Sequence, residues 1–268
     1  MIHREFRPHP RLARDVKLIW TLELDVPMGR AEVERILPDG LVEAVFDFGE
    51  PYWMRRDGER FQRQPSSFAV SQTRRFLEIR PAGRSGFVAI RFYPWGARRF
   101  FGLPLSDFAD SHLPAEELWG RAAEELVEKL AEDRSSEERV ARVESFLLER
   151  FDDSPPDVVD GGARLIWAHR GQLTVRALSR RLGVGERLLE RKFRASAGAS
   201  PKRLIRLARF LSVCHELRRH PKSLAELAHG AGYHDQAHFI KECREFSGVT
   251  PGQLMRRPSV TFLEPDGV

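Results

Sequence analysis

The sequence contains little cysteine and no long apolar run. Its 268 residues include only two cysteines, Cys214 and Cys243, and both fall in segments that we expect to be helical. Neither a disulfide framework nor a Cys-x-x-Cys zinc site is therefore available. A run of about 18 apolar residues never occurs, and the first fifteen residues carry charges throughout, unlike a signal peptide. We accordingly expect a cytoplasmic protein with no membrane partner.

Histidine is also scarce in the first 150 residues, where only His3, His9 and His112 occur. A metal-dependent oxygenase built on β-strands needs a cluster such as His-x-His together with a carboxylate. The scattered histidines do not supply that cluster. The sequence therefore gives little support to metal-dependent catalysis, and we expect no cofactor and no metal site.

Charge is distributed unevenly along the chain. Residues 164–257 hold 20 Lys plus Arg against 7 Asp plus Glu, whereas the rest holds 24 basic and 32 acidic residues. Such a surplus attracts a polyanion, because binding to phosphates releases counterions. A solvated, arginine-rich helical surface would explain the same count. With 41% apolar residues and a length near that of two domains, each part has enough apolar side chains for a core.

Residues 1–112 have the pattern of short β-strands. Apolar side chains alternate with others in residues 41–48 and 87–93, and proline–glycine clusters separate the segments. This pattern predicts an antiparallel sandwich or small barrel, which can enclose a small molecule. Aromatic residues here can line a pocket or fill the core, and they are Trp20, Phe46, Phe48, Trp53, Phe92 and Trp95. We assign no effector-binding residue among them.

The next two segments have different patterns. Between residues 116 and 151 we expect two amphipathic helices, whose apolar stripes are covered either by the N-terminal domain or by a second copy of the chain. Residues 152–162 combine acidic residues with two prolines and two glycines, which is typical of a linker. The sequence thus predicts helices at 113–151, a candidate dimerisation segment, and then a linker at 152–162.

The strongest pattern is an internal repeat within residues 163–257. Residues 174–184 align with residues 223–233 at an offset of 49, and after the next turn the offset is 50, so that Pro201 aligns with Pro251. Each copy has the pattern of a short helix, a tight turn and a second helix. Two helix-turn-helix units are therefore predicted, followed by a tail at 258–268.

Capping residues predict where the helices of the repeat begin. Thr174 and Ser223 precede the first helix of each copy, and Asp235 precedes the second helix of the second copy. The helix from Pro201 to about Arg218 has a serine before its proline, as helix starts often do. This helix joins the two units, and we expect it to hold them at a fixed separation.

The second helix of a helix-turn-helix unit lies in the major groove, where arginine, lysine, glutamine and glutamate can contact base edges. With Leu189 and Phe193 buried, helical geometry turns four residues of the first unit outward. They are Arg187, Glu190, Arg191 and Arg194. A basic solvated helix would give the same pattern.

In the second unit, Phe239 and Cys243 take the inward positions, so we expect Cys243 to belong to the core. The outward residues are Gln236, Ala237, Ile240, Lys241 and Arg244. We expect His238 to pack against the protein rather than to read a base. Ile240 can contact a thymine methyl group or be partly buried.

Residues 232–256, with the sequence GYHDQAHFIKECREFSGVTPGQLMR, resemble the C-terminal signature of AraC/XylS-type transcription regulators. The first unit, LTVRALSRRLGVGERLLERKF, is similar to the other half of that domain, so the resemblance covers about residues 163–257. It implies that the two recognition helices enter successive major grooves, about 34 Å apart, on one face of the duplex. It also implies a cupin-like effector domain at the N-terminus. Two departures from the family pattern are Cys243, where phenylalanine is usual, and His238, where tyrosine is common.

The resemblance places the base-reading positions on residues that the helical geometry also turns outward. These are Arg187, Glu190, Arg191, Gln236, Ala237, Ile240 and Lys241. We expect further residues to contact phosphates, namely Thr174, Arg194, Lys202, Arg206, Arg244 and Arg256.

The sequence therefore predicts an α+β protein, with a β-rich, cupin-like domain and amphipathic helices followed by an all-α domain of two helix-turn-helix units. We expect a sequence-specific transcription regulator that binds double-stranded DNA and responds to a small molecule. RNA polymerase and a second copy of the chain are further candidate partners. Two alternatives stay open: an architectural DNA-binding protein without sensing, and an enzyme fused to a DNA-binding module. An enzyme of the DNA-repair methyltransferase type would need a reactive cysteine.

Overall fold

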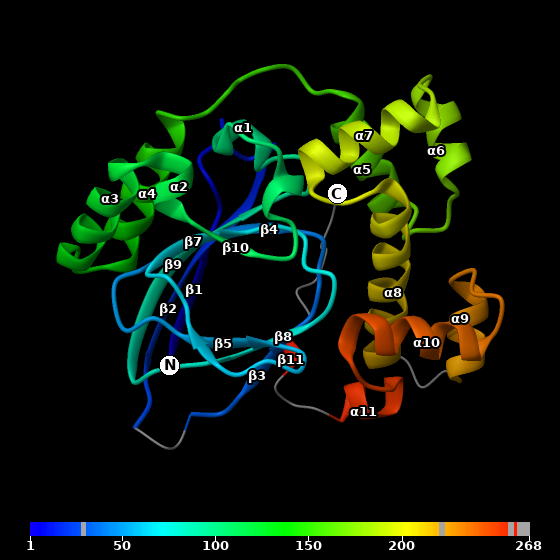
Figure 1. Ribbon diagram of the computed structural model, residues 1–268, viewed down its shortest axis with the longest axis horizontal. Helices are drawn as coiled ribbons and strands as arrows, with labels where there is room; N and C mark the ends of the chain where they lie inside the picture. The colour runs from blue at the N-terminus through cyan, green and yellow to red at the C-terminus, as the bar shows by residue number, and fades with distance from the viewer. Residues whose placement is uncertain (28–30, 220–222, 257–259, 262–268) are drawn as a thin grey trace.

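A computed structural model describes residues 1–27, 31–219, 223–256 and 260–261. The chain folds into an N-terminal part of β-sheets and flanking helices and a C-terminal part of helices alone (Figure 1). This arrangement confirms the α+β class predicted from the sequence. Across the described residues, no helix has both the length and the apolar character needed to span a membrane.

Two sheets form the N-terminal part, and they face each other in Figure 1. Within the described residues the first has six strands, in the order β1 (Ile2–Phe6), β2 (Val16–Asp25), β9 (Arg84–Phe92), β4 (Val42–Asp47), β7 (Ser67–Val70) and β10 (His112–Pro114). The second has five there, in the order β11 (Val260–Thr261), β3 (Glu34–Ile36), β8 (Leu77–Arg80), β5 (Trp53–Arg56) and β6 (Gln62–Arg63). All pairings are antiparallel except that of β11 with β3.

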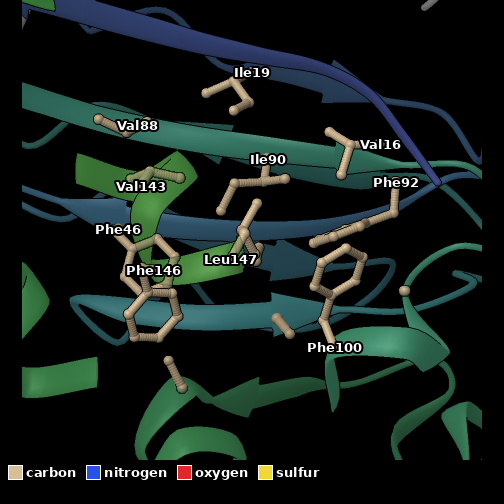
Figure 2. Packing of buried hydrophobic residues seen from close by; sticks show 14 of the residues in the cluster. Val16, Ile19, Phe46, Val88, Ile90, Phe92, Phe100, Val143, Phe146 and Leu147 are labelled. Atoms are coloured by element: carbon tan, nitrogen blue, oxygen red, sulfur yellow. The ribbon is translucent and has the colours of Figure 1, made fainter. Parts of the chain in front are cut away.

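The central strands of the first sheet alternate as the sequence predicts, but both of their faces are covered. On β4, Ala44 and Phe46 belong to the core beneath the helices, whereas Val45 and Asp47 face the space between the sheets. On β9, Ile90 lies on the helix side. Figure 2 shows the helix side, where side chains from the sheet meet those of a helix.

Helices cover one face of this sheet. They are α1 (Arg98–Phe101), the 3-10 helix η1 (Leu105–Phe108), α2 (Ala115–Trp119), α3 (Arg121–Glu132) and α4 (Ser136–Leu148). The sequence analysis predicted two helices between residues 116 and 151, but Gly120, with φ +59°, separates a short first helix. Val143 and Phe146 of α4 are buried against Phe46 and other sheet residues (Figure 2). Because the apolar stripes pack within the chain, they no longer give a reason to expect a dimer.

The expected linker at 152–162 is wrong in its second half. Helix α5 (Val158–Ala168) begins there, and Asp157 caps it through a reciprocal pair of hydrogen bonds with Asp160. The two glycines, which the sequence analysis took as breakers, lie inside this helix. Gly162 is close to Phe193: a Cβ atom at Gly162 would lie 2.8 Å from the Phe193 ring. A glycine is therefore needed for packing, not for a turn.

The first half of this segment is held in place by a buried arginine. The Arg99 guanidinium is fully buried and pairs with Asp15 at 2.9 Å and with Asp160 at 3.2 Å. It also donates hydrogen bonds to carbonyl groups of the segment, those of residues 152, 154 and 155. Residues 152–157 thus form an extended segment that is bound along its length.

The C-terminal part contains the repeated units. The first unit has α6 (Val175–Leu182) and α7 (Glu186–Ala197), a long helix α8 (Pro201–Arg219) follows, and the second unit has α9 (Leu224–Gly230), α10 (Gln236–Ser247) and α11 (Pro251–Met255). Thr174 and Asp235 accept the predicted capping hydrogen bonds from backbone amides, and Ser223 forms a capping box with Glu226. The predicted tail is not wholly separate, because Val260–Thr261 pairs with β3. Residues 258–259 and 262–268 of that tail lie outside the described residues.

Candidate nucleic-acid interface

The first unit presents a basic face on α7. Leu189 and Phe193 are fully buried in a cluster with residues of α5, α6 and α8, and this fixes the rotation of the helix. Arg187, Glu190, Arg191 and Arg194 are all exposed, as the helical period predicts. Gly183, with φ +66°, ends α6 and forms the tight turn.

Of these four residues, two pair with each other. Arg194 donates to Glu190 at 2.8 Å, with exposed fractions of 62% and 52%. An exposed pair of this kind contributes about 0.3–0.5 kcal/mol, so both side chains can be drawn to another partner. No carboxylate of the described residues pairs with Arg187 or Arg191. Their guanidinium groups therefore remain available to an external acceptor.

The second unit presents a less basic face on α10. Phe239 and Cys243 are fully buried. Gln236, Ala237, Lys241 and Arg244 are exposed, and Ile240 is half-buried. Burial raises the pKa of Cys243 to about 11, so its thiol is a packing group and not a nucleophile.

His238 differs from the sequence expectation. We expected it to pack against the protein rather than to read a base; its ring does lie edge-on to Tyr233, with ring centroids 5.2 Å apart, but the residue is exposed. Tyr233 is itself only 2% exposed. His238 therefore lies at the surface and covers the buried Tyr233 ring from one side.

Arg206 also differs from the expectation. We expected it to contact a phosphate, but it donates to Glu242 at 2.6 Å and also pairs with Glu245. Burial acts to lower the pKa of Arg206, yet the two carboxylates raise it well above its usual value. Tyr233 donates to the other Glu242 oxygen at 2.6 Å. Arg206 therefore fastens α10 to α8 and is already neutralised by its partners.

The helix α8 connects the two units rigidly. It contributes Leu204 and Ala208 to the core of the first unit, and Phe210 and Val213 to the core of the second. Figure 1 shows α8 running from the end of α7 to the level of α10. A change in the separation of the two recognition helices would have to break one of these cores.

A hollow of about 570 Å³ lies between the units. Four of the predicted contact residues line it: Thr174 from the first unit, Lys202 and Arg206 from α8, and Lys241 from α10. Glu242 and Glu245 also line it, with their arginine partners. The other three residues expected to contact phosphates are exposed elsewhere: Arg194 on α7, and Arg244 and Arg256 on the second unit.

A second candidate site lies between the two sheets of the N-terminal part. This cavity has a volume of about 380 Å³ and is mostly apolar. Of the aromatic residues named from the sequence, Trp20 lines it, whereas Phe46, Phe92 and Trp95 belong to cores. The sequence analysis did not identify Asp47 as a cavity residue, although the alternation of β4 places it on the other face of the strand from Phe46.

The described residues hold no group of three or more His, Cys, Asp or Glu side chains that could bind a metal ion. His112 lies at the cavity. Burial lowers its pKa to about 4, so its imidazole is neutral at pH 7.

Comparison with known proteins agrees with the repeated unit. A family model described as a helix-turn-helix domain matches residues 178–257, and one described as a domain of unknown function (DUF6597) matches residues 4–114. The HTH-type transcriptional regulator GlxA of Rhizobium meliloti (strain 1021) is 30% identical over 109 residues, which are 41% of this chain and 34% of the relative. The chain thus spans about a third of the length of this curated relative.

Two solved structures are also similar. ToxT from Vibrio cholerae O395 has 12% identity and a TM-score of 0.45, covering 84% of this chain and 96% of that one. The DNA-binding domain of AdpA in complex with a target DNA has 23% identity and a TM-score of 0.36, covering 38% of this chain and 98% of that one. The helix-turn-helix match falls on the two units described above. Over its helical part the chain is therefore similar to helix-turn-helix transcriptional regulators such as GlxA, in agreement with the repeat found in the sequence.

Proposed function

We propose that the chain binds a specific double-stranded DNA site by inserting α7 and α10 into two successive major grooves. The observation that carries this proposal is that both recognition helices have exposed polar faces while one helix, α8, belongs to both of their cores. Fixed separation matters because two grooves on one face of a duplex lie about 34 Å apart. Base reading is assigned to Arg187, Glu190, Arg191, Gln236, Ala237, Ile240 and Lys241.

Phosphate contacts position the protein on the duplex without reading its sequence. Thr174 and Lys202 line one hollow between the units, beside the base-reading Lys241, and the backbone between two grooves would pass there. Arg194, Arg244 and Arg256 extend this set. Arg206 is left out because Glu242 and Glu245 neutralise it.

We further propose that a small molecule in the N-terminal cavity modulates DNA binding. Strands β3 and β8 line the cavity through residues such as Glu34 and Leu77. The adjacent residues contact the end of α10: Arg35 donates to the Ser247 carbonyl and the Phe76 amide donates to the Phe246 carbonyl, both at 2.9 Å. A ligand that moves these strands would therefore move the second recognition helix.

The test begins with sites selected from random duplexes by the full chain. We expect Arg187→Ala or Arg191→Ala to weaken binding to the selected site by about 1–3 kcal/mol and to relax the preference at one base pair, since each replaces a base contact. Lys202→Ala and Arg244→Ala should weaken binding to all sequences alike and reduce the salt dependence, since each removes a phosphate contact.

Arg134→Ala is the matched control, because Arg134 is exposed on the N-terminal part, far from the proposed interface in the sequence. Fluorescence anisotropy at fixed salt concentration measures all these affinities. If Arg191→Ala bound the selected site as tightly as the parent, the assignment of α7 would be wrong. Uniform coating of DNA in a footprint would instead favour an architectural protein.

A further inference from the structure

The cavity between the sheets contains a buried carboxylate with an oxygen that bonds to nothing. Asp47, the last residue of β4, is only 4% exposed and lines the cavity. Its Oδ2 has no hydrogen-bond partner among the described residues. A buried carboxyl oxygen without a partner is costly, so its presence needs an explanation, and a bound ligand is one that fits a cavity. Asp47 therefore points to a ligand that donates to this oxygen.

The charges around Asp47 favour a cationic ligand. Glu5, Glu34 and Glu43 also line the cavity, and the lining arginine, Arg91, pairs with Glu43 at 3.1 Å. The remaining titratable groups at the cavity are His3, Tyr52 and His112, together with the chain's terminal residue Met1. The positive charge of Arg63, on β6, acts to lower the pKa of Asp47. Arg63 itself pairs with Glu50 at 2.7 Å. Acidic side chains thus outnumber the cations on the described cavity walls, which are Arg91 and the amino terminus of Met1, so an anionic ligand would meet repulsion.

Apart from Gln64, the remaining walls of the cavity are apolar and aromatic. Trp20, Tyr52, Phe68 and Phe87 line it together with valine, leucine and isoleucine side chains. Aromatic faces attract organic cations, and apolar walls favour a ligand whose body is hydrocarbon. A polyol would lose its hydration here without enough partners.

We propose that this cavity binds a small organic cation, an apolar body with one ammonium group that pairs with Asp47. This inference rests on the proposed sensing function, because it names the class of molecule that is sensed. The volume of about 380 Å³ lies within the range of small-molecule pockets.

Binding should be accompanied by proton release. Burial raises the pKa of Asp47 to about 8, so the carboxyl group of the empty cavity holds its proton at pH 7. An ammonium ion pairs with the ionised form. The carboxyl proton therefore leaves to solvent as the ion pair forms, and the affinity should rise between about pH 6 and pH 8.

The experiment uses isothermal titration calorimetry on the full chain with 2-phenylethylamine, 2-phenylethanol and 3-phenylpropanoate, which share one body and differ in charge. We expect the amine to bind at least about tenfold more tightly than the other two. Comparison of two buffers with different ionisation enthalpies at pH 7 should show close to one proton released. This comparison needs no variant, so it stands even if a substitution prevents folding.

Asp47→Asn should reduce amine affinity by about tenfold or more, abolish proton release and leave the alcohol's affinity unchanged. Asp25→Asn, at an exposed position of β2, is the control and should change none of these values. The proposal is overturned if the amine does not bind at millimolar concentration, if the alcohol or acid binds as tightly, or if Asp47→Asn binds the amine like the parent.

DNA affinity is measured separately, with and without the amine. DNA binding without any amine binding would refute the cation site and leave the DNA-binding proposal intact. Amine binding that leaves DNA affinity unchanged would support the cation site and refute ligand modulation.

Discussion

Two buried carboxylates in this chain differ in their partners, and the difference assigns them different roles. Glu242 accepts hydrogen bonds from Arg206 and Tyr233, so it fixes α10 against α8. Asp47 has an oxygen without a partner and lies at a cavity. A satisfied carboxylate rigidifies its surroundings, whereas an unsatisfied one weakens the fold until something binds.

The free-energy cost of burying an ionised Asp47 should make the stability of the fold depend on pH. Burial raises its pKa from 3.8 to about 8 in the folded chain, whereas in the unfolded chain it ionises near pH 4. Between these values the folded state holds the extra proton, so stability falls as pH rises through the window. Asp47→Asn has no proton to lose. We expect its free energy of unfolding, relative to the parent, to be nearly unchanged at about pH 4 and a few kcal/mol higher at about pH 8.

Urea unfolding of the ligand-free chain across this pH range gives the difference between variant and parent. Taking the difference cancels the titration of groups that both proteins share. Asp25→Asn changes the same charge at an exposed site and should show no such trend. A constant difference at all pH values would mean that Asp47 is ionised throughout.

The outward faces of α7 and α10 could be predicted from the sequence, because each depends only on helical periodicity around two buried residues. The environment of Arg206 could not, because it depends on Glu242, which is 36 residues away. Asp47 stood in a correctly predicted alternation, but a strand pattern does not show that a cavity lies beside it.

At the scale of the element, α5 shows that glycine in a sequence can mark either the end of a helix or a close contact within one. Gly161 and Gly162 looked like the end of a linker, yet both lie within a helix that packs on the first unit. A Cβ atom at Gly162 would lie 2.8 Å from Phe193, whereas at Gly161 the nearest atom would be Leu182 Cδ2 at 3.4 Å. The distinction depends on the tertiary contact with α7 and is invisible in the local sequence.

These neighbouring glycines make a matched pair for a stability test. Gly162→Ala should destabilise the chain by about 1–3 kcal/mol, because the methyl group displaces the Phe193 ring and α7 with it. Gly161→Ala should be neutral or stabilise by up to about 1 kcal/mol, because alanine is the better helix former and the space is free. Thermal unfolding followed by circular dichroism measures both. Equal effects would show that α5 does not pack on Phe193 as described.

At the scale of the whole molecule, the two parts of the chain are joined by shared cores. Trp95 from the N-terminal part is buried in the core of the first unit, and Phe76 is buried in the core of the second. The segment between the parts is bound by Arg99, which also pairs with Asp15 and Asp160. Composition predicted a linker at 152–162, but only residues 152–157 lie outside a helix. It could not show that the carbonyl groups of the segment have a buried partner from a distant helix.

Arg99→Met is therefore expected to destabilise the chain by about 3–5 kcal/mol, because it leaves Asp15 and Asp160 buried without their shared partner. Arg121→Met is the control: Arg121 pairs with Glu125 at 3.2 Å, but the two side chains are 86% and 49% exposed, so its loss should cost no more than about 0.5 kcal/mol. Digestion with a broad-specificity protease gives an independent readout. Residues 152–157 of the Arg99 variant should be cleaved at least about tenfold faster than those of the parent. Each 1.4 kcal/mol lost from the free energy of local opening raises the population of the open, cleavable segment about tenfold. If cleavage were unchanged there while stability fell, Arg99 would stabilise the fold without holding this segment, and the two parts would be fastened by the shared cores alone.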